Sequence, residues 1–191
     1  MNADLDHASE TLLAELKDHA LLIGEVTLSS GQTAQYYVDA KRALLRPPAF
    51  RAAGELIAAE AAERGAAAVG GMTMGADPLA CAAIGSGSGD GLVAFFVRKE
   101  RKQHGLQRWI EGPELPEGTR CLVVEDVVTT GGSTVRAIER IREHGLEVAG
   151  VTAVLDRLAG GTAAIERAAG APYRPLLTID DLYPDRPDRA G

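Results

Sequence analysis

LVVEDVVTTGGSTVRA, residues 122–137, says more about the architecture of this chain than any other segment. It begins as an apolar run, continues through the acids Glu125 and Asp126, passes a threonine- and glycine-rich turn and enters a helical pattern. Glycines let a backbone turn tightly and approach a ligand, and the unpaired N–H groups at a helix start favour phosphate. The segment therefore predicts a buried strand, a phosphate-binding turn and a helix in succession.

The two acids narrow the choice of ligand for that turn. Carboxylates beside a phosphate would repel it unless they served another group, and ionised carboxylates only accept hydrogen bonds. Ribose hydroxyls are natural donors, so a ribose 5-phosphate is the predicted ligand. The segment lacks the G-x-x-x-x-G-K-[ST] pattern and its lysine, so it is not a Walker loop. The alternative is an ordinary strand–turn–helix whose Asp caps the helix.

The flanking sequence alternates between strands and helices. Apolar strands are predicted at 66–72, 92–97, 120–125 and 148–155, and helices from Pro47 to Gly65 and at 78–84, 133–145 and 162–169. Strands that are apolar on both faces indicate an α/β fold with a central parallel sheet flanked by helices, whose ligands bind beyond the carboxyl ends of the strands.

The two ends of the chain do not fit this alternation. A helix is expected from Leu5 to Ala20 with a stop near Gly24, followed by two short strands within 25–39 around Ser30-Gly31. We expect residues 1–45 to form an N-terminal helix and a small hood, and residues 46–191 to form a single core domain. The tail after Pro172 is expected to cap the same sheet edge or to fray.

Composition excludes several classes of protein. The 191 residues are 46% hydrophobic, which argues against wholesale disorder, and the net charge of -7 makes nucleic acid and anionic membranes poor partners. No apolar run has the length of a membrane span, and the acidic N-terminus does not resemble a signal peptide. Cys81 and Cys121 are expected to be small buried side chains rather than a disulfide, which favours the cytoplasm.

A basic segment, VRKERKQHGLQRWIEG at 97–112, stands out against the negative total charge. It holds five of the 20 Lys and Arg residues, and it begins where a buried strand ends. A charge run of this kind is usually a solvated surface loop. Its place at the ligand edge, and the presence of Gly105, instead favour a mobile loop whose cations close over an anionic leaving group.

The segment 122–137 resembles the loop that binds phosphoribosyl pyrophosphate (PRPP) in type I phosphoribosyltransferases, with the pattern [ED]-D-x-x-[ST]-[ST]-G-x-[ST]. The resemblance implies that Glu125 and Asp126 bind the ribose hydroxyls and that residues 129–134 hold the 5-phosphate. It also leaves Asp126 as a candidate acceptor for the proton of the base. The implied PRPP-binding residues in this segment are Glu125, Asp126, Val127, Val128, Thr129, Thr130, Gly131, Gly132, Ser133 and Thr134.

The basic segment resembles the V-R-K-E-x-K-x-H-G catalytic loop of orotate phosphoribosyltransferases. This resemblance implies that Lys102 and His104 act catalytically on the pyrophosphate, with Arg98 and Lys99 assisting. It also implies a homodimer in which the 98–112 loop reaches the active site of the neighbouring subunit.

Two further segments resemble the base-binding parts of that family. SSGQTAQYYVDAKR, at 29–42, is similar to its hood element and implies that Tyr36 and Tyr37 pack near the pyrimidine, although packing within the hood alone is an equal alternative. Arg157, after the strand that ends in LDR, could grip the orotate carboxylate in two-point fashion, with Thr129 nearby. A structural ion pair between Arg157 and Asp156 is the other interpretation.

The implied reaction transfers the 5-phosphoribosyl group from PRPP to orotate, giving orotidine 5'-monophosphate and pyrophosphate in pyrimidine biosynthesis. Mg²⁺ is expected as a cofactor held through PRPP rather than by direct protein ligands. Ser29 and Met74 occupy places where many relatives carry lysine. A purine or xanthine phosphoribosyltransferase, a non-catalytic PRPP-sensing regulator and a generic α/β phosphate-binding protein remain alternatives.

Overall fold

The computed structural model, which describes residues 3–27, 33–100 and 109–189, is built on a six-stranded sheet with the order β5-β4-β3-β6-β7-β8. All neighbouring strands are parallel except β5, which pairs antiparallel with β4. The strands are β3 (Ala68–Met72), β4 (Val93–Val97), β5 (Ile110–Glu111), β6 (Arg120–Val128), β7 (Glu147–Asp156) and β8 (Tyr173–Thr178). The α/β fold with a central parallel sheet predicted from the alternating pattern is confirmed, apart from the antiparallel edge strand β5.

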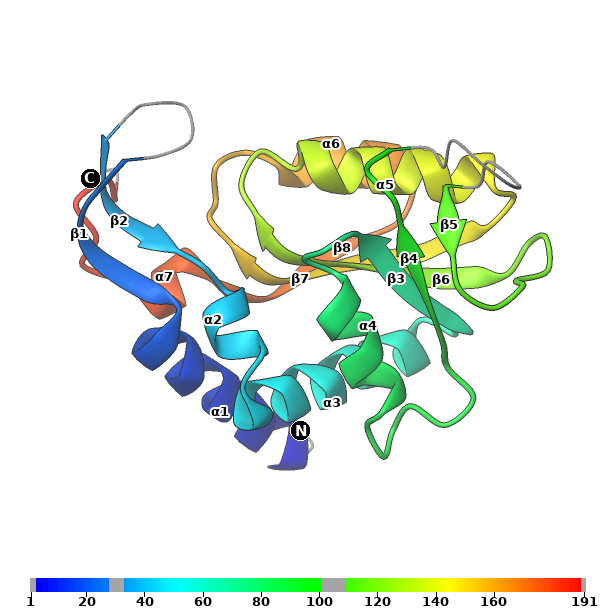
Figure 1. Cartoon of the computed structure of the whole chain (residues 1–191), viewed down its shortest axis with the longest axis horizontal. Coiled ribbons are helices and arrows are strands. Elements are labelled where there is room, and N and C mark those ends of the chain that lie inside the picture. Colours follow the sequence, from blue (N-terminus) through cyan, green and yellow to red (C-terminus); the bar gives the residue numbers. More distant parts are fainter. Residues whose placement is uncertain (1–2, 28–32, 101–108, 190–191) are drawn as a thin grey trace.

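Helices cover both faces of this sheet (Figure 1). Helices α3 (Pro47–Glu63) and α4 (Asp77–Ile84) lie on one face, and α5 (Gly132–Glu143) and α6 (Thr162–Ala169) lie on the other. Two hydrophobic clusters follow from this layering, because alternate residues of β6 point to opposite faces. Leu122 and Val124 belong to the cluster with α3, whereas Cys121 and Val123 belong to the cluster with α5.

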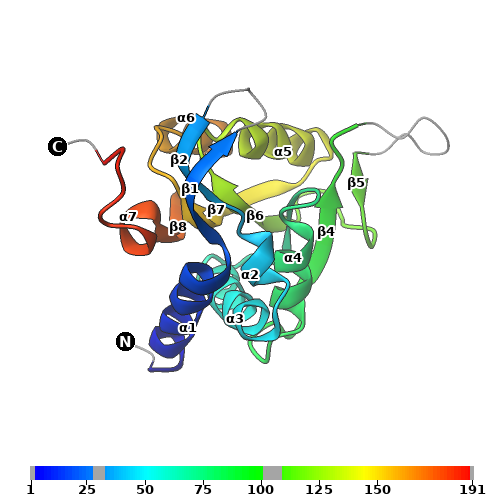
Figure 2. The same cartoon turned by 60° about the vertical axis from the view of Figure 1, so that its left-hand side comes forward.

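The N-terminal segment builds a separate hairpin at one end of the sheet. Helix α1 (Ala3–His19) packs Leu12 and Leu16 into the α3 cluster. The chain then forms the antiparallel pair β1 (Leu21–Thr27) and β2 (Thr33–Val38), and the short helix α2 (Lys41–Leu44). Figure 2 shows this hairpin and α7 (Ile179–Leu182) at the same end of the molecule as the C-terminus.

Four expectations about local structure are wrong. Gly24 does not stop the first helix, which ends at His19; it lies inside β1 with φ 135°. The residues after Pro172 do not merely cap the sheet, because Tyr173–Thr178 is strand β8, paired in parallel with β7. Strand β6 runs on to Val128, since pairing with β7 satisfies its backbone through Val128↔Asp156. Cys121 is buried as expected, but Cys81 is exposed.

None of the helices in the described ranges has the length and apolarity to cross a bilayer.

Strand β3 has no room for a side chain at Gly71. A Cβ there would collide with the carbonyl oxygen of Val124 and lie 2.9 Å from the Cβ of Ala76. We predict that Gly71→Ala lowers the free energy of unfolding by about 2–4 kcal/mol, because a buried strand cannot move aside without strain. Denaturant unfolding measures this loss. Gly87→Ala is the control, because nothing lies within 4 Å of a Cβ at Gly87; equal stability of the two variants would contradict the prediction.

Candidate active site

A cleft of about 250 Å³ opens at the carboxyl ends of β3 and β6, where parallel sheets of this kind bind ligands. We call it the main cleft. It lies among the loop after β3, the end of β6, the first turn of α5 and two lysines that come from α2 and from the segment after β4. The residues that carry its chemistry are Lys41, Lys99, Glu125, Asp126 and Ser133.

Glu125 and Asp126 leave β6 toward opposite layers but border the same cleft. The Thr134 hydroxyl of α5 donates to Glu125 Oε2 at 3.3 Å, whereas Lys41 Nζ of α2 donates to Asp126 Oδ2 at 3.4 Å. The loop after β3 closes against both acids, since a Cβ at Gly75 would lie within 3.0 Å of each carboxylate. The paired acids therefore face an open cavity rather than a closed, salt-bridged interior.

The two carboxylates lie in different surroundings: Glu125 is buried, whereas Asp126 is partly exposed beside Lys41. The pKa of Glu125 is raised to about 8, chiefly by burial of its side chain and also by the neighbouring charge of Asp126. Asp126 has Lys41 as its counter-ion, and its Oδ1 accepts the Val127 N–H at 2.9 Å. Glu125 therefore holds a proton more tightly than an ordinary glutamate does.

Lys41 is the cleft residue that motif matching missed. Its ammonium lies 3.0 Å from Asp39 Oδ1 as well as 3.4 Å from Asp126 Oδ2, and its side chain is 43% exposed. Burial alone would lower its pKa, but the carboxylates of Asp39 and Asp126 more than offset burial and raise it. The signal available in the sequence was only the D-x-K spacing after the second strand, which has no meaning until the hairpin places it beside β6.

The turn before α5 is shaped for a close approach by a ligand. Gly131 has φ 78°, and a Cβ there would lie 2.9 Å from Ile165 Cγ1, so both backbone and packing require glycine. Helix α5 has no side-chain hydrogen bond at its N-cap, which leaves its first N–H groups available to an anion. This contradicts the alternative in which an Asp caps the helix.

The predicted phosphate-binding residues divide into three environments. Thr129, Thr130 and Gly132 are exposed at the turn, and Ser133 and Val127 line the main cleft. The Val128 side chain is instead buried in the α5 cluster, and its carbonyl accepts the Arg157 N–H at 2.9 Å. Thr134 is buried, and its hydroxyl is directed to Glu125.

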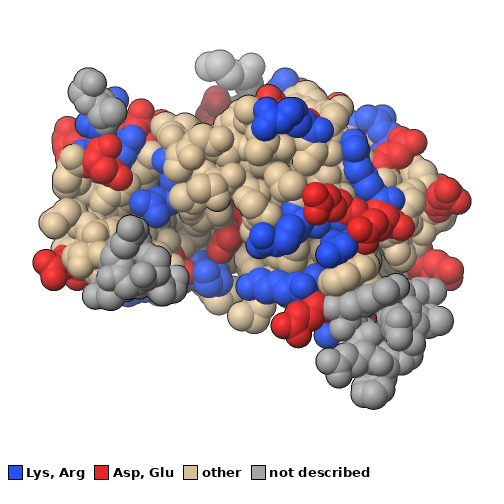
Figure 3. Space-filling model, turned by 90° about the horizontal axis from the view of Figure 1, so that it is seen from above, with Lys and Arg blue, Asp and Glu red and all other residues tan. Residues whose placement is uncertain are grey.

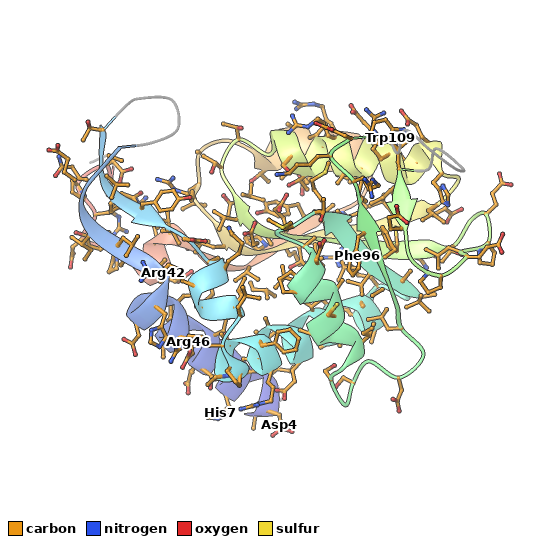
Figure 4. All side chains as sticks on the ribbon, in the orientation of Figure 1. Asp4, His7, Arg42, Arg46, Phe96 and Trp109 are labelled. Carbon is orange, nitrogen blue, oxygen red and sulfur yellow. The ribbon has the colours of Figure 1, made fainter. Side chains whose placement is uncertain are left out.

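The described ends of the basic segment are tied to the sheet. Lys99 lines the main cleft, whereas Arg98 pairs with Glu111 of β5 at 3.1 Å and donates its N–H to the Trp109 carbonyl at 2.9 Å. The Arg140 guanidinium of α5 lies 3.8 Å from the centre of the Trp109 ring, and Figure 4 shows Trp109 beside α5. Lys102 and His104 lie outside the described residues, as does Ser29.

A second cavity, of about 380 Å³, lies under the β1–β2 hairpin, and we call it the hood pocket. Tyr36 and Arg157 both line it, with the Arg157 Nη2 donating to the Tyr36 hydroxyl at 3.3 Å. Tyr36 is buried and Tyr37 is exposed, so the two rings point to opposite faces of β2 and cannot both face this pocket. Asp156 accepts the Leu158 N–H at 2.7 Å, and the ion pair considered for Arg157 does not form.

Known proteins match this arrangement over nearly its whole length. The family model for the phosphoribosyl transferase domain matches residues 56–166. Orotate phosphoribosyltransferase of Streptomyces avermitilis is 47% identical, covering 93% of this chain and 98% of the relative, and that of Corynebacterium glutamicum is 51% identical, covering 89% and 91%. The chain belongs to the orotate phosphoribosyltransferases. A crystal structure of the Mycobacterium tuberculosis enzyme in complex with Fe(III) dicitrate superposes with a TM-score of 0.82 at 44% identity, covering 92% of this chain and 98% of that one.

Met74, where the sequence resemblance implies a lysine in many relatives, carries no charge in this chain. Met74 is 71% exposed at the rim of the main cleft. Lys41 opens onto the same cleft from α2. The structure thus keeps a cation at this cleft although the loop after β3 has none.

The raised pKa of Glu125 predicts a pH-dependent stability. Glu125 keeps its proton up to about pH 8 in the folded protein, whereas a glutamate in the unfolded chain loses its proton near pH 4.5. The stability that this proton provides is therefore full below pH 4.5 and is lost as the pH rises through 8. Glu125→Gln removes this titration. We expect its melting temperature to match the parent near pH 5 and to exceed it by roughly 10 °C near pH 9.

Differential scanning calorimetry across pH 5–9 measures this difference. Glu114→Gln removes the same charge at an exposed position and controls for net charge. Melting curves of Glu125→Gln that run parallel to those of the parent at every pH would contradict a raised pKa.

Proposed function

We infer that this chain transfers the 5-phosphoribosyl group of PRPP to orotate, giving orotidine 5'-monophosphate and pyrophosphate. The observation that carries the inference is the main cleft, where two carboxylates at the end of β6 adjoin the uncapped start of α5. A ribose fits this pair of features, because its hydroxyls need acceptors while its phosphate needs N–H donors. The S. avermitilis and C. glutamicum relatives are orotate phosphoribosyltransferases, which supports this assignment.

The PRPP subsites follow from the main cleft. A crystal structure of the M. tuberculosis relative in complex with PRPP, 40% identical with a TM-score of 0.77, supports the same ligand here. Asp126 accepts a ribose hydroxyl as a carboxylate, and Glu125 either accepts a hydroxyl or donates its own proton. Thr129, Thr130 and the N–H groups of residues 131–134 hold the 5-phosphate. Asp126 is also our candidate acceptor for a proton leaving orotate.

Cations at the main cleft can neutralise the negative charge that pyrophosphate gains when its bond to carbon 1 of the ribose breaks. Lys99 and Lys41 stand at the main cleft, and we propose that Lys102 and His104 join them from the basic segment. The face seen in Figure 3 gathers Lys and Arg side chains over its middle, in a protein whose net charge is -7. Arg98 plays a supporting part, since its pair with Glu111 ties the start of the segment to β5.

Magnesium suits this site as a partner of the substrate. Within the described ranges no group of three His, Cys, Asp or Glu residues could hold a metal alone, but the hard oxygens of Asp126 and Glu125 border the cleft in which the pyrophosphate and ribose oxygens would lie. When bound there, Mg²⁺ would neutralise charge on the leaving pyrophosphate. The protein's own part is to present these carboxylates and to set lysines around them.

Orotate is placed by Arg157 and Tyr36 in the hood pocket. Within the described chain, Arg157 Nε is buried without a hydrogen-bond partner, and such a donor calls for an acceptor from a ligand. A planar carboxylate meets this requirement, whereas uracil and purines have none.

We further propose a cytoplasmic homodimer in which the 98–112 segment serves the neighbouring subunit, with residues 1–45 as the hood and residues 46–191 as the core.

A spectrophotometric assay tests the function. Protein mixed with PRPP, Mg²⁺ and orotate should consume orotate absorbance, whereas hypoxanthine, adenine and xanthine should not be turned over. Lys102→Ala should reduce the rate on the order of 10²-fold, because a cation at the leaving group is lost. Turnover of a purine without orotate would reverse the assignment, and a variant as fast as the parent would remove Lys102 from the mechanism.

Lys41 gives a second test, with a matched control on the same helix. Lys41→Met takes the counter-ion from Asp126 and leaves the cleft more negative, so kcat/KM for PRPP should fall by about tenfold or more. Arg42→Met removes a charge next to it, from an exposed side chain outside the cleft, and should stay within about twofold of the parent. Equal kcat/KM values for the two variants would show that Lys41 does not contribute to the reaction of PRPP.

A further inference from the structure

The C-terminal tail, residues 183–189, closes one side of the hood pocket. Pro187 and Asp188 line the pocket together with Tyr36 and Arg157. The Tyr36 hydroxyl donates to Asp188 Oδ2 at 3.0 Å and accepts from Arg157 Nη2 at 3.3 Å. A carboxylate of the tail is thus connected to the arginine through a single phenol.

The tail is held in place by its own contacts. Arg186, whose side chain is 10% exposed, pairs with Asp180 of α7, and its Nε lies 3.3 Å from Asp188 Oδ1. Arg189 donates to the Pro184 carbonyl at 2.8 Å. The Tyr183 ring meets the Tyr36 ring edge to face, with centroids 5.5 Å apart. Tyr36 is therefore fixed from two sides by the tail, by a ring contact and by a hydrogen bond.

Both oxygens of Asp188 are engaged, one by Arg186 and the other by Tyr36. This matters because a bare carboxylate in the hood pocket would repel an anionic base. Arg186 offsets the charge, and the hydrogen bond from Tyr36 leaves its hydroxyl oxygen free to accept from Arg157. The Arg157 guanidinium also lies 5.3 Å from the centre of the Tyr36 ring, which restrains it further.

We propose that Asp188 is a positioning residue for the base: through Tyr36 it holds the Arg157 guanidinium so that its unpartnered Nε meets the carboxylate of the acceptor. This rests on the proposed function, because it takes the acceptor to be a carboxylated pyrimidine. The hydrogen bond between Tyr36 and Asp188 does not involve the atoms whose bonds change, so we expect it to stabilise bound orotate and the transition state equally. Its loss should weaken binding of the base rather than slow transfer.

Steady-state kinetics of Asp188→Ala test the proposal. The KM for orotate should rise roughly three- to tenfold, in line with the net worth of one hydrogen bond, while kcat and the KM for PRPP stay within about twofold. Asp188→Asn retains an acceptor for Tyr36 and should recover most of the loss. Asp185→Ala is the matched control, an exposed acid of the same tail outside the pocket.

A double-variant cycle separates positioning from general damage to the tail. Tyr36→Phe removes the shared hydroxyl but keeps the ring, so adding Asp188→Ala to it should cost nothing more. Additive effects, or a KM for orotate in Asp188→Ala no higher than in Asp185→Ala, would overturn the proposal. Orotate binding by calorimetry gives a readout besides turnover, so a parent that binds orotate but forms no nucleotide would refute the proposed function and leave this inference standing.

Discussion

The whole site depends on two adjacent carboxylates being kept at the end of a buried strand. Backbone pairing carries β6 to Val128, so Glu125 and Asp126 leave it toward opposite layers of the fold. Each then needs its own partner, and finds it in a different element, Thr134 of α5 or Lys41 of α2. The strand, the helix after it and the short helix after the hairpin are thereby bound to one another through the acids that face the ligand.

This arrangement also explains how an acidic protein can accept a polyanion. Two ionised carboxylates in one cleft would oppose pyrophosphate, but burial keeps a proton on Glu125, and Lys41 balances Asp126. Lys41 and Lys99 both line the cleft and offset the negative charge of its acids. The total charge of -7 is spread over other surfaces, where it affects solubility more than binding.

The sequence predicted the α/β sheet because apolar strands and amphipathic helices leave strong periodic signals. The glycine-rich turn before α5 was recognisable in the sequence, and the structure gives the reason for its glycine: Gly131 has φ 78°, and a Cβ there would crowd Ile165. Strand β8 was missed because Tyr173–Thr178 contains Pro175 and alternates weakly, and its assignment depends on pairing with β7. Lys41 and Asp188 were missed for a related reason: each acts across more than 80 residues, at Asp126 and at Tyr36.

Such distant contacts show that a cation at a cleft need not come from the loop that borders it. Pyrophosphate is a diffuse anion, and a lysine on a long flexible stem can reach it from several directions. At Met74 the chain has no cation, yet α2 directs Lys41 into the same cleft from another layer. The requirement is on the charge at the cleft rather than on the position in the sequence that supplies it. A sequence motif records only the position of a residue in the chain, whereas the electrostatics of the folded site depend on the charge at the cleft.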